Sequence, residues 1–199
     1  MTWRTPSLRR MLAAQLTAFA LMLSMPSASL VAQTFGDRRA HVGLKLFRTL
    51  LTADMGIHER IDRDGQLLIV FAHADDARDA SKHASDLAVD FAGIRGHPVR
   101  TDVATTEQIL GKNGYRPAAI FLSQRLEESE VRRLVSYGID HRIVVFSPFE
   151  GDVERGILGG ISVEATVRPL INMKTLAASG LAIKDFYLKV AKHYGDGSD

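Results

Sequence analysis

LLIVFA, residues 67–72, is a continuous apolar run of strand length. A strand without polar positions is expected where helices cover a sheet on both faces. Similar runs follow at 118–123, AAIFLS, and at 142–147, RIVVFS. HPVRTDVA, residues 97–104, has the composition of a further strand, and Pro98 opens it where a missing backbone donor is tolerated. These four stretches predict the strands of a buried sheet.

Helical patterns separate the predicted strands. Residues 38–52 place six large apolar side chains on one broad face, and a loop and helix over 73–93 follow the first strand. A threonine cap predicts a short helix within 105–114, and the helix predicted for 126–138 has acids in its first turn and ends at Gly138. This alternation predicts an α/β layered domain with a mostly parallel central sheet flanked by helices.

A pair of strands departs from this rhythm in the last third of the chain. Residues 157–165 and 166–172 read as two short strands joined by a tight connection. Gly159-Gly160 precedes a strand rather than a helix, so a positive φ or a close backbone approach is expected there instead of a dinucleotide loop. Pro169 makes the second strand an edge strand or a bulged one.

Two short helices are predicted after this pair. Asn172 caps residues 173–179, and Gly180 ends that helix with Leu181 as its hydrophobic contact. Residues 185–194 form a final helix, with an acid at its start and bases at its end. The predicted fold is therefore the layered α/β domain plus a C-terminal strand pair and two short helices.

The first 32 residues have the pattern of a secretory leader. Three arginines precede an apolar run of 13 residues from Met11 to Leu23, and small residues follow up to a cleavage zone near Ala32. The run is short for a membrane-spanning helix, which needs about 20 residues, and an uncleaved anchor stays open as the alternative. The sequence therefore predicts a signal peptide at 1–32, a single domain at 33–195, a disordered tail at 196–199 and a periplasmic location.

Composition excludes several classes of protein. Hydrophobic residues make up 46% of the 199, which is enough for a packed core, and the absence of cysteine excludes disulfides and thiolate metal sites. The formal charge of the whole chain is +2, and it falls to −1 once the three leader arginines are removed. Because no concentrated basic face remains, no nucleic-acid partner is expected.

No motif carries a catalytic constellation, so we expect no enzyme, no metal and no cofactor. HADDARDA, residues 73–80, could hold magnesium in the manner of a phospho-receiver, but the third strand lacks the receiver's aspartate and the acids fit a helix N-terminus. The seven histidines have no metal-ligand spacing. A dispersed hydrolase triad of Ser123, His73 and Asp102 stays open as an alternative, although nothing in the spacing of these residues singles them out.

A partner-binding surface is predicted around Phe149, Glu150 and Arg168. Phe149 lies in a loop, where a large apolar side chain is either covered by its own domain or covered by a partner. The other two residues are charged: Glu150 follows Phe149 in the same loop, and Arg168 lies in the predicted C-terminal strand pair.

The C-terminal segment resembles the signature of the YfiR family, which consists of exported bacterial proteins. The order is Gly-Gly-Ile, a short strand, an arginine, Ile-Asn, a short helix, Gly-Leu-x-Ile and a last helix. The similarity of element order covers nearly all of the region after the leader, and the specific part is the last forty residues. The matching residues are Gly159, Gly160, Ile161, Arg168, Ile171, Asn172, Gly180, Leu181 and Ile183.

The resemblance implies regulation rather than catalysis. Its best-known members hold an inner-membrane diguanylate cyclase inactive from the periplasm and so control cyclic di-GMP, biofilm formation and motility. Others accompany sensor histidine kinases. The implied partner is therefore the periplasmic part of such a cyclase or kinase, and a homodimer stays open.

Three features depart from the family pattern. The first helix ends in LLTADMGI instead of an aromatic residue and a Trp-Pro pair, the last helix opens with Lys184-Asp185 instead of serines, and cysteines are absent, so redox control is not carried over. The alternative function is a periplasmic small-molecule-binding protein or sensor-kinase accessory, with a ligand in the crevice at the carboxyl ends of the strands.

Overall fold

The computed structural model describes residues 28–91, 93–111 and 114–195, with side chains from Arg38 on, Asp90 apart. Residues Met1–Asp37 and Arg38–Asp199 form separate compact units, and all the strands belong to the second. Residues 1–27 of the predicted leader lie outside the described residues, and so does the whole tail predicted for 196–199. No helix in the described part of the chain is both long and apolar enough to span a membrane.

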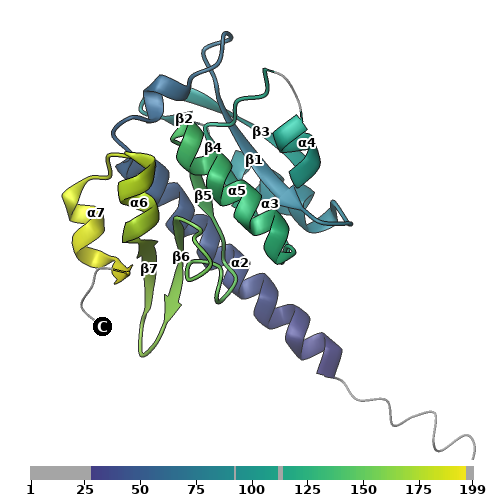
Figure 1. The fold of residues 1–199 in the computed structure, drawn as a ribbon. Helices are drawn as coiled ribbons and strands as arrows, with labels where there is room; N and C mark the ends of the chain where they lie inside the picture. Colours follow the sequence, from purple (N-terminus) through teal and green to yellow (C-terminus); the bar gives the residue numbers. More distant parts are fainter. Residues whose placement is uncertain (1–27, 92, 112–113, 196–199) are drawn as a thin grey trace, which may run out of the picture. The chain divides into compact units, whose positions relative to one another are not determined.

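An eight-stranded sheet runs through the second unit in the order β2-β3-β1-β4-β5-β6-β7-β8 (Figure 1). Strands β3, β1, β4, β5 and β6 are parallel neighbours, whereas β2 pairs with β3 and β7 with β6 in the antiparallel sense. The strands span Leu67–His73 (β1), Gly93–Ile94 (β2), His97–Thr105 (β3), Ala119–Leu122 (β4), Val144–Phe146 (β5), Gly159–Val163 (β6), Val167–Asn172 (β7) and Lys192–Tyr194 (β8).

The five parallel strands have the doubly wound order 2-1-3-4-5 when they are numbered along the chain. The connection from β1 runs to β3 on one side, and the connection from β3 then crosses to β4 on the other side of β1. A topological switch point therefore lies between the carboxyl ends of β1 and β4. Doubly wound sheets bind ligands in the crevice outside such a point.

Helices cover both faces of the sheet. Four phenylalanines on α2, β1, β4 and β5 pack together on one face, beneath α2 (Ala28–Ala53) and α3 (Arg78–Asp90). Their ring centroids lie 5.4–5.7 Å apart, close enough for favourable aromatic contacts. Helices α4 (Thr106–Gly111) and α5 (Glu128–His141) cover the other face with a second apolar cluster. The predicted layered α/β fold is thus confirmed.

The C-terminal strand pair and its two helices are also confirmed. Helix α6 (Met173–Ser179) is capped at its start by Asn172, whose Oδ1 accepts from the Thr175 N–H at 2.9 Å, and at its end by Gly180, with φ +62°. Helix α7 (Asp185–Val190) follows. A short 3-10 helix, η1 (Ile57–Arg60), lies between α2 and β1.

The two glycines that open β6 allow close packing. A Cβ at Gly160 would lie 2.5 Å from Cγ2 of Val153 and 3.0 Å from the carbonyl oxygen of Ser147, and a Cβ at Gly159 would lie 2.9 Å from Cδ2 of Leu50. Close backbone approach, rather than a positive φ, therefore explains this pair.

Three details of the sequence prediction are wrong. Helix α5 continues past Gly138 to His141, because this glycine makes room for Val145, whose Cγ2 would lie 2.7 Å from an added Cβ. The final helix ends at Val190, and the residues after it pair with β7 as strand β8. Strand β7 lies inside the sheet; Pro169 is tolerated because β8 pairs only from Leu170 onward.

Candidate functional site

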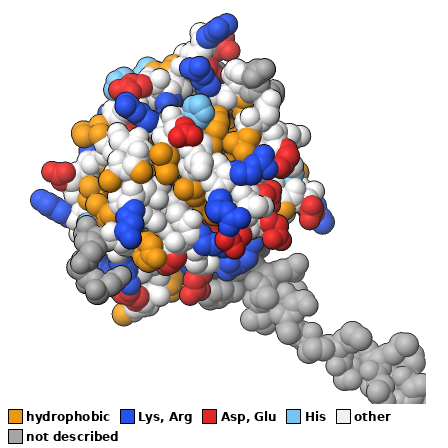
Figure 2. Space-filling model, viewed as in Figure 1, with side chains coloured by type: hydrophobic (Ala, Val, Ile, Leu, Met, Phe, Trp, Pro, Cys, Tyr) orange, Lys and Arg blue, Asp and Glu red, His pale blue; other side chains and the backbone are white. Residues whose placement is uncertain are grey.

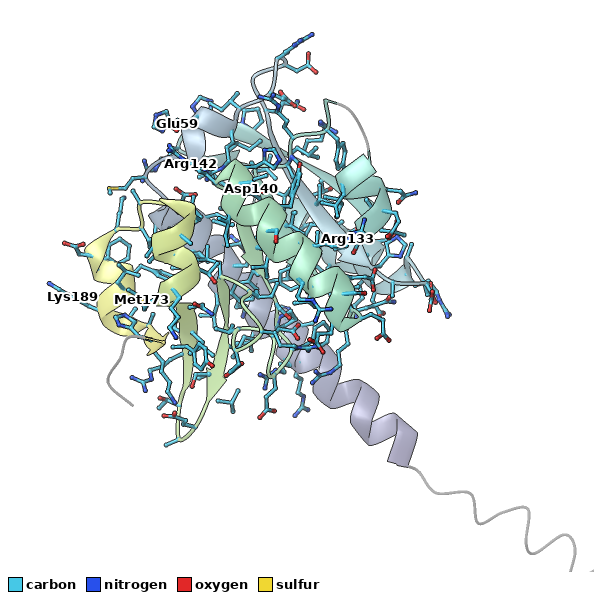
Figure 3. All side chains as sticks on the ribbon, viewed as in Figure 1. Glu59, Arg133, Asp140, Arg142, Met173 and Lys189 are labelled. Carbon is cyan, nitrogen blue, oxygen red and sulfur yellow. The ribbon has the colours of Figure 1, made fainter. Side chains whose placement is uncertain are left out.

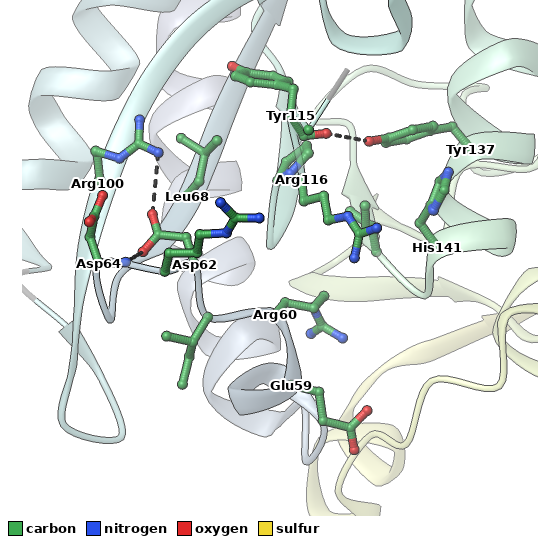
Figure 4. A pocket seen from close by; sticks show the side chains of 15 residues that line it. Glu59, Arg60, Asp62, Asp64, Leu68, Arg100, Tyr115, Arg116, Tyr137 and His141 are labelled. Carbon is green, nitrogen blue, oxygen red and sulfur yellow. Dashed lines mark hydrogen bonds and ion pairs between the residues drawn. The ribbon is translucent and has the colours of Figure 1, made fainter. Parts of the chain in front are cut away.

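An open pocket of about 800 Å³ lies at the amino ends of the parallel strands (Figure 4). Its walls come from η1 and the turn after it, from β3, from the segment before β4 and from the end of α5. Figure 3 shows Glu59 and Arg142 at this same end of the sheet. We call it the amino-end pocket; its charged and aromatic lining residues are Glu59, Arg60, Asp62, Arg63, Asp64, Arg100, Tyr115, Arg116, Tyr137 and His141.

Two of the four arginines in this pocket are engaged in holding the fold together. Arg60 pairs with Asp54, which is fully buried, and donates to the carbonyl oxygens of Ala118 at 3.1 Å and Arg142 at 2.8 Å. Burial raises the pKa of Asp54, and the Arg60 guanidinium opposes that rise. Arg100 lies 3.4 Å from Asp62. These guanidiniums are therefore already balanced by carboxylates.

Arg63 and Arg116 are different, because within the described residues neither guanidinium has a hydrogen bond or an ion pair, and both side chains are exposed. Figure 4 shows Arg116 on the same side of the pocket as Tyr137 and His141. Burial raises the pKa of the Tyr137 hydroxyl, and the positive charge of Arg116 partly opposes this. The Tyr137 hydroxyl donates to the carbonyl oxygen of Tyr115 at 3.1 Å, which fixes the segment that carries Arg116.

A second arrangement of polar groups lies at the opposite, carboxyl ends of the strands. His73 ends β1, and Ser123 follows β4 directly, with its N–H donating to the Ala72 carbonyl oxygen at 2.8 Å. Their neighbours Phe71 and Phe121 are register partners and point into the core beneath α3. Because strand side chains alternate in direction, His73 and Ser123 lie side by side on that same face.

Each of these two buried side chains has one polar atom without a hydrogen-bond partner. His73 is 8% exposed and Ser123 is 4% exposed, and neither the Nδ1 of His73 nor the Oγ of Ser123 has a hydrogen-bond partner within the described residues. The hydroxyls of Thr106 and Tyr187 share this condition elsewhere in the fold. The Gln124 carboxamide spans the switch point beside them: its Oε1 accepts from the Ala74 N–H at 3.0 Å and its Nε2 donates to the Asp76 carbonyl oxygen at 2.6 Å.

The dispersed triad of Ser123, His73 and Asp102 does not assemble. Asp102 pairs with Val70, whose side chain points to the opposite face of the sheet, and it accepts from the Tyr115 hydroxyl at 2.7 Å. It also lies three residues before the end of β3. The carboxylate is therefore separated from the other two residues by the sheet itself.

HADDARDA forms the turn into α3. Asp76 accepts from the Arg78 N–H at 3.0 Å and pairs with its guanidinium at 2.6 Å, and these hydrogen bonds lower the pKa of Asp76. This arrangement fits the acidic helix N-terminus that the sequence favoured. Among the residues that the structure describes, no three His, Cys, Asp or Glu side chains are grouped to hold a metal ion.

Two of the three predicted partner-binding residues, Phe149 and Glu150, interact with Arg125, whereas Arg168 interacts with Glu164. Phe149 is half-buried against the α5 side of the core, and the Arg125 guanidinium lies 5.5 Å from its ring centroid. Glu150 is exposed, and its carbonyl oxygen accepts from Arg125 at 3.1 Å. Arg168 is exposed on β7, 3.5 Å from Glu164. Phe149 is therefore partly covered by its own domain.

The residues on which the resemblance was based have structural roles in this fold. Ile171 is fully buried and pairs with Gly159, and Asn172 donates from Nδ2 to the Val153 carbonyl oxygen at 2.7 Å besides capping α6. Leu181 is buried in the main core directly after Gly180. The signature therefore describes how the last strands and helices pack.

The sequence interpretation missed Arg116, Gln124 and a buried ion pair. Asp152 is fully buried; it accepts from the Ser147 hydroxyl and pairs with Arg155. The only sequence signal for Gln124 was its position directly after a predicted strand, and the pocket around Arg116 gathers loops that are far apart in the chain.

Comparison with known proteins shows a distant likeness in fold. A ligand-free, open substrate-binding protein with adhesive properties from Clostridium difficile matches with a TM-score of 0.50 and 15% identity, over 76% of this chain and 58% of its own. The chain is similar in fold to a substrate-binding protein. At this identity the likeness extends to the fold alone.

Two other solved structures match less closely. One is an ABC domain in complex with L-Trp from Streptococcus pneumonia, with a TM-score of 0.44 and 12% identity over 72% of this chain and 61% of its own. The other is a conserved domain protein from Vibrio cholerae, with a TM-score of 0.44 and 14% identity over 68% of this chain and 56% of its own. The chain thus spans less than two thirds of each of these proteins. No protein-family model and no curated protein matches it.

Proposed function

We propose that this protein is an exported, periplasmic binding protein that holds a small molecule with a carboxylate or phosphate group in the amino-end pocket. One observation carries the proposal: Arg116 lines a ligand-sized pocket, and its guanidinium has no carboxylate partner among the described residues. Ligand pockets have volumes of about 300–1,000 Å³ and a few placed polar groups. The pocket volume of about 800 Å³ lies in this range.

The chemistry of arginine selects the ligand class. A guanidinium presents planar donors that match a carboxylate or a phosphate in two parallel hydrogen bonds. His141 adds a second nitrogen donor on the same side of the pocket, and the Tyr137 ring supplies an apolar wall (Figure 4). The substrate-binding fold of the distant neighbour supports a binding role without chemistry.

Thermal shift followed by calorimetry tests this proposal. The purified protein is screened against small carboxylates and organic phosphates, and a true ligand stabilises the fold by mass action. Arg116→Ala should weaken the ligand found by about 10–100-fold, because a hydrogen bond to a charged group contributes about 1.5–3 kcal/mol.

Arg132→Ala is the matched control, since Arg132 is an arginine on α5 that pairs with Glu128 and does not line this pocket. Equal affinity in the two variants would place the ligand elsewhere. A screen in which no anion stabilises the protein would refute the proposal.

A second candidate function is the control of a membrane signalling protein, either a diguanylate cyclase or a sensor histidine kinase. It is favoured by the exposed apolar side chains of the family-like segment. Of the six large hydrophobic residues exposed in the described chain, four lie on β6, β7 and α7: Val163, Val167, Phe186 and Val190. Figure 2 shows hydrophobic side chains among Lys and Arg where Figure 1 places α6 and α7.

Val163 and Val167 face each other at the tip of the β6–β7 hairpin and are 52% and 49% exposed. If this surface binds the inactive conformation of a partner more tightly than the active one, binding shifts the partner toward the inactive conformation. Deleting the gene should therefore raise cyclic di-GMP and biofilm. Complementation with Val163→Asp should fail, whereas Val89→Asp, at a residue 85% exposed on α3, should restore repression. Unchanged cyclic di-GMP and biofilm in the deletion strain would count against this function.

A further inference from the structure

The Gln124 carboxamide occupies the switch point between β1 and β4 as a small ligand would. Its oxygen accepts from the Ala74 N–H and its nitrogen donates to the Asp76 carbonyl oxygen, at 3.0 and 2.6 Å. Both partners are backbone groups of the loop that follows β1. That loop therefore offers one donor and one acceptor, spaced to match a single uncharged amide edge.

Two further polar atoms at the same place lack hydrogen-bond partners. The Nδ1 of His73 and the Oγ of Ser123 are buried on neighbouring strands, on the face that α3 covers, and no described residue hydrogen-bonds to either atom. An unsatisfied buried polar group costs about 1–3 kcal/mol. Buried polar groups are normally satisfied by protein, water or ligand, and the carboxyl ends of strands at a switch point are where doubly wound sheets bind ligands.

We propose that the switch point is a binding site for a small molecule that presents a neutral amide edge, such as a primary carboxamide or a lactam, and that Gln124 fills the site in its absence. The ligand's carbonyl oxygen accepts a hydrogen bond from the Ala74 N–H, and its N–H donates one to the Asp76 carbonyl oxygen. The rest of the ligand reaches Ser123 and His73. This site lies at the opposite end of the strands from the amino-end pocket and goes beyond the proposed function.

The backbone pair also sets the specificity of the site. A carboxylate has no proton to donate, so one of its oxygens would face the Asp76 carbonyl oxygen and repel it. An amide of the same shape satisfies both backbone groups. The site therefore discriminates an amide from the matched acid by leaving the acid with an unfavourable contact.

Gln124 also makes binding a competition. A tethered side chain acts at an effective concentration of about millimolar order or higher. A free amide must displace it, so the wild-type protein binds free amides weakly. Removing the side chain removes the competitor.

Acetamide is the matching probe. Gln124→Ala deletes the CH2–CO–NH2 group, which corresponds to acetamide, and leaves the other groups of the site in place. Titration with acetamide is followed by ¹H–¹⁵N NMR, with acetate as the matched anion. Gln124→Ala should bind acetamide at least tenfold more tightly than the wild type, the backbone amide signals of Ala74 and Ser123 should move, and acetate should leave them unmoved. Acetamide should also raise the melting temperature of this variant more than that of the wild type.

Three outcomes would overturn the proposal: no movement of these two signals with acetamide, equal movement with acetate, or equal affinity in the variant and the wild type. Gln124 would then be only a link between two loops. If Gln124→Ala fails to fold, Gln124→Ser and the side-chain NH2 signals of Gln124 in the wild type provide the same readout, because acetamide should shift them toward their solvent-exposed positions. Arg116→Ala should leave acetamide binding unchanged, so this result and that for the amino-end pocket are independent.

Discussion

Replacing Gly160 by alanine tests whether close packing explains the glycine pair of β6. The new Cβ would lie 2.5 Å from Cγ2 of Val153 and 3.0 Å from the carbonyl oxygen of Ser147. The valine methyl and the backbone oxygen must both give way, and overpacking of this kind costs about 1–3 kcal/mol. Alanine recovers about 0.5–1 kcal/mol relative to glycine in a strand. Because two contacts are too close at once, the cost should lie in the upper half of that range, about 2–3 kcal/mol. The net loss of stability should therefore be about 1–2.5 kcal/mol.

Two other glycines provide matched comparisons. At Gly159 an added Cβ meets only side-chain carbons, 2.9 Å from Leu50 and 3.0 Å from Phe146, which can shift more easily than backbone. Gly159→Ala should therefore cost less than Gly160→Ala. At Gly111, the last residue of α4, nothing lies within 4 Å, so Gly111→Ala should leave stability unchanged or raise it by up to about 1 kcal/mol.

Urea unfolding followed by circular dichroism measures these differences, provided that the slope of the transition stays the same in all four proteins. In a domain of this size, 1 kcal/mol shifts the melting temperature by about 2–4 °C, so Gly160→Ala should melt about 2–10 °C lower. A Gly160→Ala protein as stable as the wild type, or less destabilised than Gly159→Ala, would show that the packing argument is wrong.

Phe47→Ala should lose about 3–5 kcal/mol of stability in the same assay, because its fully buried ring contacts two others, whereas Phe47→Leu should lose markedly less. Arg155→Ala should lose about 1–3 kcal/mol by leaving the buried Asp152 carboxylate without its cation, and adding Asp152→Asn should recover part of that loss; no recovery would contradict the explanation. Lys192 lowers the pKa of Glu164, so Lys192→Met should raise that pKa toward its ordinary value in an NMR titration. The wild type should lose the contribution of this ion pair as the pH falls through the pKa of Glu164, and the variant should lose only the smaller contribution of the remaining pair with Arg168.

The sequence was sufficient to predict the strands and helices of the layered fold. The apolar runs at 67–72 and 118–123 have no polar position that could face water, which is typical of strands in a sheet covered on both faces. It was misleading where tertiary contacts override a local pattern. Gly138 has the composition of a helix end but is a packing glycine against Val145. Residues 192–194 continue a helical pattern but pair with β7, whose outer edge is free there.

The candidate sites depend on strand order, which local patterns do not contain. His73 and Ser123 were recognisable as strand ends, but the sequence did not show that β1 and β4 are neighbours at a switch point. The amino-end pocket depends still more on topology. Three of its arginines lie far apart in the chain: Arg60 in η1, Arg100 in β3 and Arg116 in the segment before β4. Only the parallel order of the sheet brings them to one end.

Both edges of the sheet are very short, and this has a consequence for association with other molecules. Strand β2 has two residues and β8 has three, and Lys192 begins the latter. A long, flat edge strand would offer a row of unpaired backbone groups to another chain, and short edges with charged residues are how natural sheets prevent aggregation through such pairing. A complex of this protein should therefore form through side chains rather than through an extension of the sheet from one molecule into the next.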